Sequence, residues 1–404
     1  MIMALSTDHS TRSVADILGA IAASTEAVAQ QKPGAREKVL ALSHQLVSAL
    51  ETPSETIQRM GWAEPARFAA TQLAVDLKIF EKLEEAHDAP VSLSDLTKST
   101  GADAALLART MKHLSAMDVV GETGADEYIS TPISTALTVP KFRDGISYLF
   151  NVAGPSFHSI PAYLKATGYG NPGNIADGPF QFAHKTQNPF FIWLAEHPGY
   201  GEQFNNYMSG YRQGKRSWCD EGFYPVMDRI GQGLNPETPL LVDVGGGLGH
   251  DLLELRTNHP ELSGRLILQD QPDVIKQVGN AAEGIELAVH DFFTPQPVKG
   301  AKAYYLHSVL HDWDDASCLQ ILHNIVPAMT PGYSKLLINE NVVPDFGAAW
   351  PITSMDWLMM ALGAVKERTE RQWRGLLQQA GLEVKGIWTY EQGTESLIEA
   401  EVAV

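Results

Sequence analysis

The sequence LLVDVGGGLGHDLLEL, residues 240–255, decides the fold of this chain. Its first part, residues 240–244, is a short apolar run with the length and composition of a buried strand. The glycines that follow, Gly245, Gly246 and Gly247, let the backbone turn tightly and approach a ligand closely. The remainder has the apolar spacing of a helix, whose first N–H groups are free to bind a ligand. A strand, a glycine turn and a helix in this order predict the ligand-binding start of an α/β sheet.

Strands and helices alternate through the rest of the chain. We expect strands at residues 240–244, 265–269, 286–289, 303–306, 335–339, 384–389 and 395–404. Such alternation is typical of a parallel sheet covered by helices on both faces. The final run, SLIEAEVAV, alternates apolar and polar residues after a turn that contains glycine, which favours an antiparallel insertion. The sequence therefore predicts an α/β, Rossmann-like domain with a seven-stranded sheet whose last strand is antiparallel.

The glycine turn favours a cationic nucleoside over a dinucleotide. Counting from Gly245, His250 stands where the dinucleotide fingerprint G-x-G-x-x-G requires its third glycine. Asp243, just before the turn, would repel a pyrophosphate but attract the cationic amino-acid end of S-adenosylmethionine. S-adenosylmethionine is therefore the predicted cofactor, with Asp243, Gly245, Gly246 and Gly247 as candidate binding residues.

Acidic residues follow the next two predicted strands. Asp270 could accept hydrogen bonds from both ribose hydroxyls, as carboxylates at this position do in other nucleoside-binding sheets. Asp291 could bond to the adenine amino group, and Phe292 could cover the ring. Each residue taken singly is more often a helix cap or a core residue. Their occurrence at successive strand ends favours the nucleoside interpretation.

The stretch YYLHSVLHDWDD, residues 304–315, supplies a candidate general base. His311 follows the fourth predicted strand and would project from the carboxyl edge of the sheet, where ligands of such sheets bind. An imidazole with an ordinary pKa of about 6.5 can accept a proton near neutral pH. A lone histidine is nevertheless more often a structural residue.

Two carboxylates strengthen the assignment of His311. Glu340 ends the following strand, and Glu367 lies in AVKERTE, residues 364–370. A carboxylate beside an imidazole fixes its tautomer and stabilises the imidazolium that forms when it accepts a proton. These residues predict a proton-abstraction site that needs no metal. Glu367 could instead form an ion pair with Arg371 at the start of a helix.

The chain before the sheet has a different character. We expect a helical N-terminal domain at residues 1–150, an aromatic-rich connector at 151–235 and the cofactor domain at 236–404. A helix at 104–117 followed by VVGETGADEYIS, two β-prone runs around a turn, predicts a winged helix. The amphipathic helices at 13–30 and 35–50 could pack on a partner or on their own subunit. The aromatic side chains of the connector suit a planar, apolar substrate.

Composition excludes several classes of protein. The net charge of −18 would repel a phosphate backbone, which disfavours nucleic-acid and anionic-membrane partners and makes the winged helix a scaffold. Two cysteines, Cys219 and Cys318, are too few for a disulfide framework and lack zinc-site spacing. We find neither a secretory signal nor an apolar run long enough to span a membrane. The sequence predicts a cytoplasmic protein.

The chain as a whole resembles the class I S-adenosylmethionine-dependent O-methyltransferases of the plant caffeic-acid type, in their fungal secondary-metabolism branch. The segments that carry the resemblance are DGPFQFAHKT (177–186), NNYMSGYRQGKRSW (205–218), VDVGGGLG (242–249), HDWDD (311–315) and KERT (366–369). The resemblance implies a homodimer that methylates a hydroxyl of a small aromatic or polyketide-like metabolite and releases S-adenosylhomocysteine. Its N-terminal region would be the dimerisation domain.

The same resemblance implies roles for individual residues. Gly245, Gly246, Asp270, Asp291 and Phe292 would hold the cofactor, and His311 would be the base flanked by Glu340 and Glu367. His307 departs from the pattern, because the family usually has lysine or arginine near the cofactor there. Some fungal members are pericyclases that keep the cofactor without transferring its methyl group. Such an activity is the alternative hypothesis; the presence of His311 with both glutamates favours the transferase.

Overall fold

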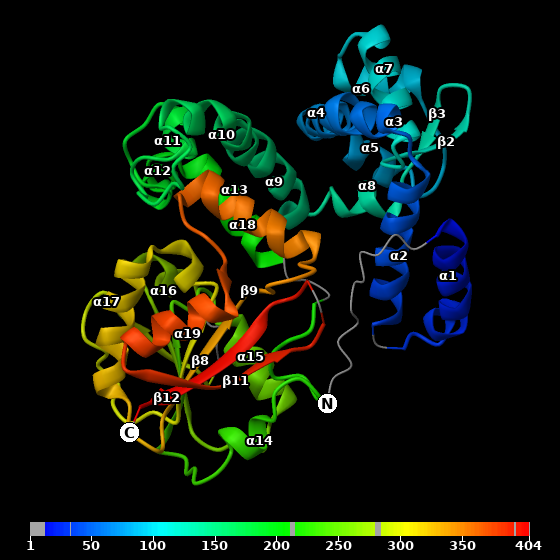
Figure 1. Ribbon diagram of the computed structural model, residues 1–404. Coiled ribbons are helices and arrows are strands. Elements are labelled where there is room, and N and C mark those ends of the chain that lie inside the picture. Colours follow the sequence, from blue (N-terminus) through cyan, green and yellow to red (C-terminus); the bar gives the residue numbers. More distant parts are fainter. Residues whose placement is uncertain (1–12, 33, 211–214, 279–283, 392, 404) are drawn as a thin grey trace. The chain divides into compact units, whose positions relative to one another are not determined.

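The computed structural model describes residues 13–32, 34–210, 215–278, 284–391 and 393–403, which form two compact units (Figure 1). Unit 1 comprises Met1–Pro155 and Phe191–Gln213, and unit 2 comprises Ser156–Phe190 and Gly214–Val404. The segment 151–235 therefore contributes to both units, and its treatment as a separate connector stays a prediction. Residues 1–12, and residues 211–214 within the motif 205–218, lie outside the described residues.

Unit 1 is mainly helical. Its first helix is capped by Ser13, whose side chain accepts a hydrogen bond from the Asp16 backbone while the Asp16 carboxylate bonds back to the Ser13 backbone. The helices of unit 1 are α1 (Val14–Ala29), α2 (Ala35–Leu50), α3 (Pro53–Gln58), α4 (Glu64–Asp76), α5 (Ile79–Glu85), α6 (Leu93–Thr100), α7 (Ala104–Ala116), α8 (Pro132–Ala136), α9 (Pro140–Tyr148), almost all of α12 (Phe190–Glu196), and α13 (Pro198–Gly210).

Two strands of a small antiparallel sheet follow α7, where the β-prone runs were predicted, and a third strand precedes it. Strand β3 (Glu127–Ile129) lies between β1 (Val91–Ser92) and β2 (Gly121–Gly124). Tyr128 of β3 is fully buried and belongs to the core of this unit. The other large members of that core are Ile79, Phe80, Leu83, Leu96, Leu107, Met111 and Leu114.

Unit 2 contains the predicted seven-stranded sheet. Its strands are β4 (Pro239–Val244), β5 (Arg265–Asp270), β6 (Glu286–Val289), β7 (Ala303–His307), β8 (Lys335–Glu340), β11 (Leu382–Thr389) and β12 (Ser396–Val402). Their order is β11-β12-β8-β7-β4-β5-β6, and β12 runs antiparallel to both of its neighbours. The predictions of seven strands and of an antiparallel last strand are therefore confirmed.

Helices cover both faces of this sheet because its strands are apolar on both sides. On β4, Val242 and Val244 pack into one core cluster, whereas Leu241 packs into the other. The first cluster lies under α17 (Asp315–Ile325) and α19 (Glu370–Gln379), and the second under α15 (His250–Asn258). The remaining helices of unit 2 are α10 (Gly154–Ala166), α11 (Pro179–His184), α14 (Val226–Arg229), α16 (Pro272–Val278) and α18 (Trp350–Gly363).

The strand order puts the expected ligand-binding edge of the sheet at the carboxyl end of β4. The chain leaves β4 into α15 on one face and leaves β7, the neighbouring strand, toward α17 on the other. Where consecutive connections diverge in this way, the carboxyl ends of the two strands stay uncovered, and ligands bind there. The glycine turn follows β4, and His311 follows β7, so both candidate sites lie at this edge.

Among the described residues, no helix combines the length and the apolar character needed to cross a bilayer.

Candidate active site

The glycine turn after β4 is built around the side chain of Asp243. Gly245 and Gly247 have φ angles of +77° and +59°, in the left-handed region that glycine adopts without strain. At Gly246 a Cβ atom would lie 2.3 Å from the carboxyl carbon of Asp243 and 2.6 Å from Leu268. Only glycine fits at position 246, because the Asp243 carboxyl packs directly beneath it.

Asp243 is the buried polar group of this turn. Asp243 is 0% exposed, and neither of its carboxylate oxygens has a hydrogen-bond partner among the described residues. Burial, and then the nearby charge of Asp251, raises its pKa well above the ordinary value, while His307 opposes the shift. A buried carboxyl without a partner is costly unless a ligand or cation compensates it. This group is therefore suited to a positive charge bound close to the turn.

Asp270 lies beside the same turn. Its Oδ2 accepts a hydrogen bond from the backbone N–H of Gly247 at 2.8 Å, and Oδ1 accepts one from Gln271 at 2.7 Å. Burial raises the pKa of Asp270, and these two N–H groups partly offset the shift. A carboxylate oxygen can accept more than one hydrogen bond, so Asp270 keeps acceptor capacity for a ligand hydroxyl.

The segment after β6 adds an aromatic ring to this edge of the sheet. A Cβ atom at Gly245 would lie 3.6 Å from the ring of Phe292 and 3.1 Å from Val309, so the turns after β4, β6 and β7 meet here. Phe292 also contacts Trp313 edge to face, with ring centroids 6.0 Å apart. Asp291 is exposed, and its Oδ1 accepts the backbone N–H of Phe293 at 3.0 Å.

His307 is held between two carboxylates. Its Nδ1 lies 2.7 Å from Asp251 on α15, and its Nε2 lies 3.2 Å from Glu395 in the turn between β11 and β12. Both ring nitrogens are at hydrogen-bond distance from acceptors, which is the pattern of an imidazolium with two N–H donors. A protonated His307 would place a positive charge among the acidic side chains at the end of β7.

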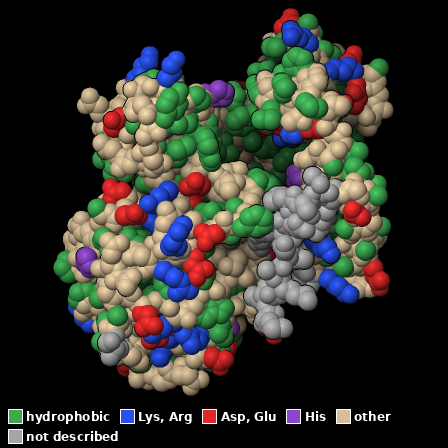
Figure 2. Space-filling model, in the orientation of Figure 1, with side chains coloured by type: hydrophobic (Ala, Val, Ile, Leu, Met, Phe, Trp, Pro, Cys, Tyr) green, Lys and Arg blue, Asp and Glu red, His purple; other side chains and the backbone are tan. Residues whose placement is uncertain are grey.

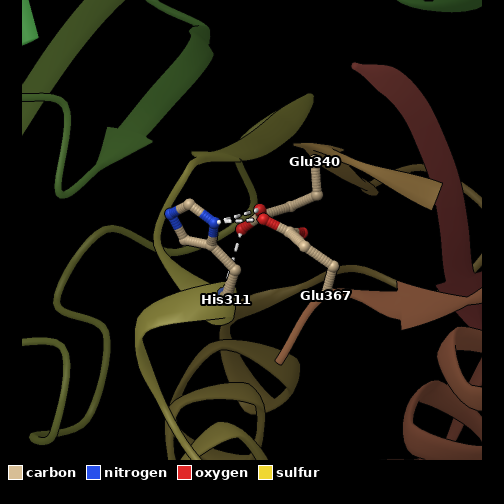
Figure 3. A group of neighbouring side chains, drawn as sticks. All are labelled: His311, Glu340 and Glu367. Carbon is tan, nitrogen blue, oxygen red and sulfur yellow. Dashed lines mark hydrogen bonds and ion pairs between the residues drawn. The ribbon is translucent and has the colours of Figure 1, made fainter. Parts of the chain in front are cut away.

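The structure brings His311, Glu340 and Glu367 together (Figure 3). Nδ1 of His311 lies 3.0 Å from Oε1 of Glu367 and 3.7 Å from Oε2 of Glu340. In Figure 3 the other ring nitrogen, Nε2, points away from both glutamates. Glu367 therefore holds the proton on Nδ1 and leaves Nε2 as the nitrogen that can accept a proton.

Glu340 also contacts the backbone that carries His311. Its Oε1 accepts the backbone N–H groups of Val309 at 3.0 Å, Leu310 at 2.8 Å and His311 at 3.3 Å. Glu340 thus fixes the 3-10 turn Leu310–Asp312, on which the imidazole is mounted. Ligand atoms of the three side chains lie within 4.8 Å of one another, which is close enough for a metal ion. Both Oε1 atoms accept N–H groups and so hold the imidazole and its turn in place, whereas the two Oε2 atoms are buried without a hydrogen-bond partner among the described residues.

Burial and the neighbouring carboxylates together set the pKa of His311. Burial lowers the pKa of this imidazole, but the carboxylates around it outweigh burial and raise the pKa well above its ordinary value. Burial raises the pKa of Glu340 to about 7 and that of Asp312 to about 6. Asp312 lies 3.7 Å from Nε2 of His311. A second cation close to this imidazole would favour its neutral form, which is the form that accepts a proton.

Three residues of the site were missed by the sequence reasoning. Asn341 donates to Oε1 of Glu367 at 3.2 Å, and Asp356 accepts the Glu367 backbone N–H at 2.9 Å. Arg368 donates to the backbone carbonyls of Leu310 and Trp313. Arg368 and Asn341 are the direct neighbours of Glu367 and Glu340 in sequence, which is the signal that could have identified them.

The residues after β4 and β5 fit the expected cofactor. Asp243 is a buried carboxyl without a partner, Asp270 retains acceptor capacity, and a Cβ at Gly247 would meet nothing within 4 Å. An open turn beside two carboxylates suits a nucleoside that carries a positive charge. The chemistry of these groups is that expected for S-adenosylmethionine.

Two family models match the chain. An O-methyltransferase domain matches residues 233–383, and an O-methyltransferase dimerisation domain matches residues 66–140. The O-methyltransferase mpaG of Penicillium brevicompactum is 42% identical over 398 residues, covering 98% of this chain and all of that protein. The demethylsterigmatocystin 6-O-methyltransferase of Aspergillus parasiticus is 37% identical and covers 83% of this chain and 85% of its own length.

Solved structures agree with this assignment. The structure of LepI with S-adenosylmethionine superposes with a TM-score of 0.87 at 31% identity, covering 96% of this chain and 100% of that one. OxaC in complex with sinefungin and meleagrin superposes with a TM-score of 0.83 at 25% identity, covering 96% and 99%. The sheet, the glycine turn, the family models and the relatives lead to one conclusion: this chain belongs to the O-methyltransferase family of fungal secondary metabolism and uses S-adenosylmethionine as its cofactor.

Proposed function

We propose that the protein methylates a hydroxyl of a small aromatic or polyketide-like metabolite, with His311 as the general base. The observation that carries this proposal is the 3.0 Å contact between Nδ1 of His311 and Oε1 of Glu367. This contact keeps the proton on Nδ1 and leaves Nε2 to accept a proton from the substrate. A base must reach the hydroxyl through a nitrogen that carries no proton. His311 is 8% exposed, so a substrate that reaches Nε2 would meet it in a largely dry environment.

The cofactor and the side chains of this protein have separate roles in the proposed reaction. S-adenosylmethionine supplies an electrophilic methyl group on a positively charged sulfur. His311 Nε2 takes the hydroxyl proton as the substrate oxygen forms its bond to the methyl carbon and the carbon–sulfur bond breaks. Because a phenol has a pKa of about 10, this proton transfer is favourable only when it accompanies methyl transfer. Glu367 stabilises the imidazolium that results, and Glu340 holds its backbone in place.

The cofactor contacts are proposed from the geometry after β4, β5 and β6. Gly245, Gly246 and Gly247 would present their backbone to the cofactor, and Asp243 would compensate its charge from beneath the turn. The ribose hydroxyls would bond to Asp270, and the adenine would lie between Asp291 and Phe292. His307 is engaged by Asp251 and Glu395, so we assign it an indirect role in ordering the acidic groups near the cofactor.

The substrate class is proposed from the aromatic side chains of unit 2 and from one relative. Helix α18 contacts both the turn Leu310–Asp312 and helix α11. Phe182 of α11 is 50% exposed, and a cavity of about 500 Å³ is lined in part by Phe182, Gln181 and Thr186. Partly exposed aromatic side chains beside a few polar groups suit a planar metabolite. The relative named as a demethylsterigmatocystin 6-O-methyltransferase supports a metabolite hydroxyl as the methyl acceptor.

The N-terminal unit is proposed to form a homodimer. The dimerisation model matches residues 66–140, which include α7 and its hairpin. We interpret this region as a winged helix that serves as a scaffold. Lys112 of α7 bonds to Glu122 and lies 3.6 Å from Asp126, so its charge is already compensated. Basic and acidic side chains are also interspersed in Figure 2, which supports a role without nucleic acid or membrane partners.

A cytoplasmic location is proposed with this function. Both cysteines, Cys219 and Cys318, are free and buried. Burial raises the pKa of Cys219 to about 11 and that of Cys318 to about 12, so neither thiol is easily ionised or oxidised. Free buried thiols are typical of proteins from reducing compartments.

A second candidate function is a pericyclic reaction without methyl transfer. It is favoured by the solved structure titled a pericyclic reaction enzyme, which superposes with a TM-score of 0.87 at 31% identity. Two buried glutamates aligned on one imidazole suit proton abstraction better than carbonyl polarisation, because they increase its basicity. The arrangement around His311 therefore favours the transferase.

Methyl-deuterated S-adenosylmethionine separates these functions. The purified protein is incubated with this cofactor and a panel of phenolic and polyketide-like alcohols, and products are analysed by mass spectrometry. We expect a deuterated methyl ether and one S-adenosylhomocysteine for each product. The variant H311A should lose turnover while its affinity for S-adenosylhomocysteine, measured by calorimetry, stays within about threefold. An isomerised product with no cofactor consumed would support the pericyclase, and full activity in H311A would refute the base assignment.

A further inference from the structure

Arg368 is a buried cation whose donors are directed at the turn that carries His311. The residue is 1% exposed. Its Nη1 donates to the carbonyl of Leu310 and its Nη2 to the carbonyl of Trp313, both at 2.9 Å. Leu310 and Trp313 flank His311 and Asp312 in the sequence. One rigid guanidinium therefore bonds the backbone on both sides of the imidazole-bearing segment.

The remaining contacts of Arg368 fix the guanidinium itself. Nε and Nη2 donate to Oδ1 of Asp315 at 3.0 and 2.8 Å, and the guanidinium lies 5.2 Å from the ring centroid of Trp373. Nη2 also lies 3.3 Å from the sulfur of Cys318. A planar guanidinium with several directed donors holds such a geometry in a way that a single ammonium cannot.

The turn is thus bound from two sides by groups of opposite charge. Oε1 of Glu340 accepts the N–H groups of Val309, Leu310 and His311, whereas Arg368 donates to the carbonyls of Leu310 and Trp313. Arg368, the first residue of β10 (Arg368–Thr369), directly follows Glu367 in the chain. Glu367 orients the imidazole and Arg368 bonds the backbone that carries it, so a shift of either residue changes the distance between His311 and Glu367.

A role limited to pairing with Asp315 does not explain this burial. The Asp315 side chain is 54% exposed and also pairs with Lys366, whose side chain is 36% exposed. An ion pair with an exposed aspartate requires no buried partner, as Lys366 shows. Burying a guanidinium is costly unless its donors are satisfied, and two of the acceptors that satisfy it are carbonyls of the His311 turn.

We propose that Arg368 is a positioning residue that sets the orientation of His311 relative to Glu367 by bonding the carbonyls on either side of the imidazole. The proposal rests on the proposed role of His311 as the base. Arg368 touches neither reacting atom and acts through the turn. Its loss should slow the proton-transfer step and leave cofactor binding intact.

Hydrogen–deuterium exchange of the dimer saturated with S-adenosylhomocysteine tests the positioning step without any substrate. In R368Q, amides in the peptide covering residues 309–314 should exchange at least tenfold faster, while peptides from β4 and β5 stay unchanged. K366Q is the matched control, because it removes a partner of the same aspartate without a contact to the turn. Unchanged exchange in the 309–314 peptide of R368Q would overturn the proposal, whether or not His311 proves to be the base.

A conservative variant covers the case in which R368Q destabilises the whole unit. R368K keeps a positive charge near Asp315 but cannot bond both carbonyls, so it should show the same local increase in exchange with a melting temperature close to wild type. Where a methylated product is available, kcat of R368K should fall at least tenfold while the KM for S-adenosylmethionine stays within about threefold. If R368K showed the exchange and kcat of the wild type, a positive charge alone would be sufficient to position the turn. This result would overturn the proposed role of the hydrogen bonds from Arg368 to the two carbonyls.

Discussion

Nδ1 of His311 lies 3.0 Å from Oε1 of Glu367, and the same oxygen accepts a hydrogen bond from Asn341 at 3.2 Å. Asn341 therefore fixes the position of Glu367, and Glu367 in turn fixes the imidazole of His311. The two residues are separated by 56 positions in the chain and come from different elements. Their contact decides which nitrogen of His311 faces the substrate and how strongly that nitrogen attracts a proton.

The first prediction concerns the pH dependence of E367Q. The carboxylates around His311 raise its pKa, and the base acts only in its neutral form, so wild-type kcat should rise as the pH increases through that pKa. Loss of the Glu367 charge should move the midpoint of this rise to lower pH. The maximal kcat should fall roughly 100-fold or more, because the imidazolium is less stabilised. The measurement is a series of kcat values from pH 5 to 9.

E370Q serves as the control for this experiment. Glu370 is an exposed neighbour in the same segment and pairs with Arg374 on α19. Its substitution should leave both the midpoint and the maximal rate at wild-type values. A pH profile of E367Q that coincides with wild type would show that Glu367 does not act on the imidazole.

The second prediction separates the charge of Glu340 from its hydrogen bonds to the backbone. In E340Q an amide oxygen can still accept the three backbone N–H groups, whereas E340A leaves them buried without an acceptor. Each unsatisfied buried group costs about 1–3 kcal/mol, so E340A should lose roughly 3 kcal/mol or more of the free energy of unfolding. E340Q should lose clearly less. Urea unfolding followed by circular dichroism measures both, and equal losses would mean that the backbone contacts are unimportant.

The third prediction concerns the glycine turn. G246A would place a methyl group 2.3 Å from the Asp243 carboxyl, so either this carboxyl or the turn must move. We expect affinity for S-adenosylhomocysteine to fall at least tenfold by calorimetry. G375A is the control, because a Cβ at Gly375, within α19, meets nothing within 4 Å. This control should be neutral or stabilising by up to about 1 kcal/mol, and wild-type affinity in G246A would contradict the packing described here.

The fourth prediction concerns stability in acid. Glu399 of β12 is fully buried and accepts hydrogen bonds from Arg229, Lys335 and Tyr224. Burial raises its pKa, but these donors outweigh burial and lower the pKa below its ordinary value. Its stabilising contribution is therefore present above the unfolded-state pKa and is lost as the pH falls through the folded-state pKa.

The comparison of wild type with E399Q measures this contribution. At neutral pH, E399Q should be less stable by roughly 3 kcal/mol, because the largely buried Lys335 and the partly exposed Arg229 each lose a fully buried charged partner. This difference should shrink as the pH falls from about 5 to 3. E286Q, which affects a surface pair with Arg265, should shift the urea midpoint only slightly. A difference that is constant with pH would rule out the charge of Glu399 as its cause.

Local sequence patterns were sufficient to locate the sheet and its binding edge. The run at 240–244, the glycines after it and the acidic residues after the next strands each follow from short-range rules on apolar length, φ angle and strand ends. Parallel strands then bring their carboxyl ends to one edge, so residues far apart in sequence could be assigned to one site. The predicted strands agree with the observed ones to within three residues at either end.

The partners of individual side chains were decided only by the three-dimensional packing. His307 lies beside Glu395, 88 residues away in the chain. Glu340 accepts backbone N–H groups in addition to lying near the imidazole, and Arg368 bonds the carbonyls of the same turn. Periodicity and propensity describe the conformation of a segment and the face that it buries. They do not specify the direction of a long polar side chain, which is set by whichever donors and acceptors the folded chain leaves unsatisfied within its reach.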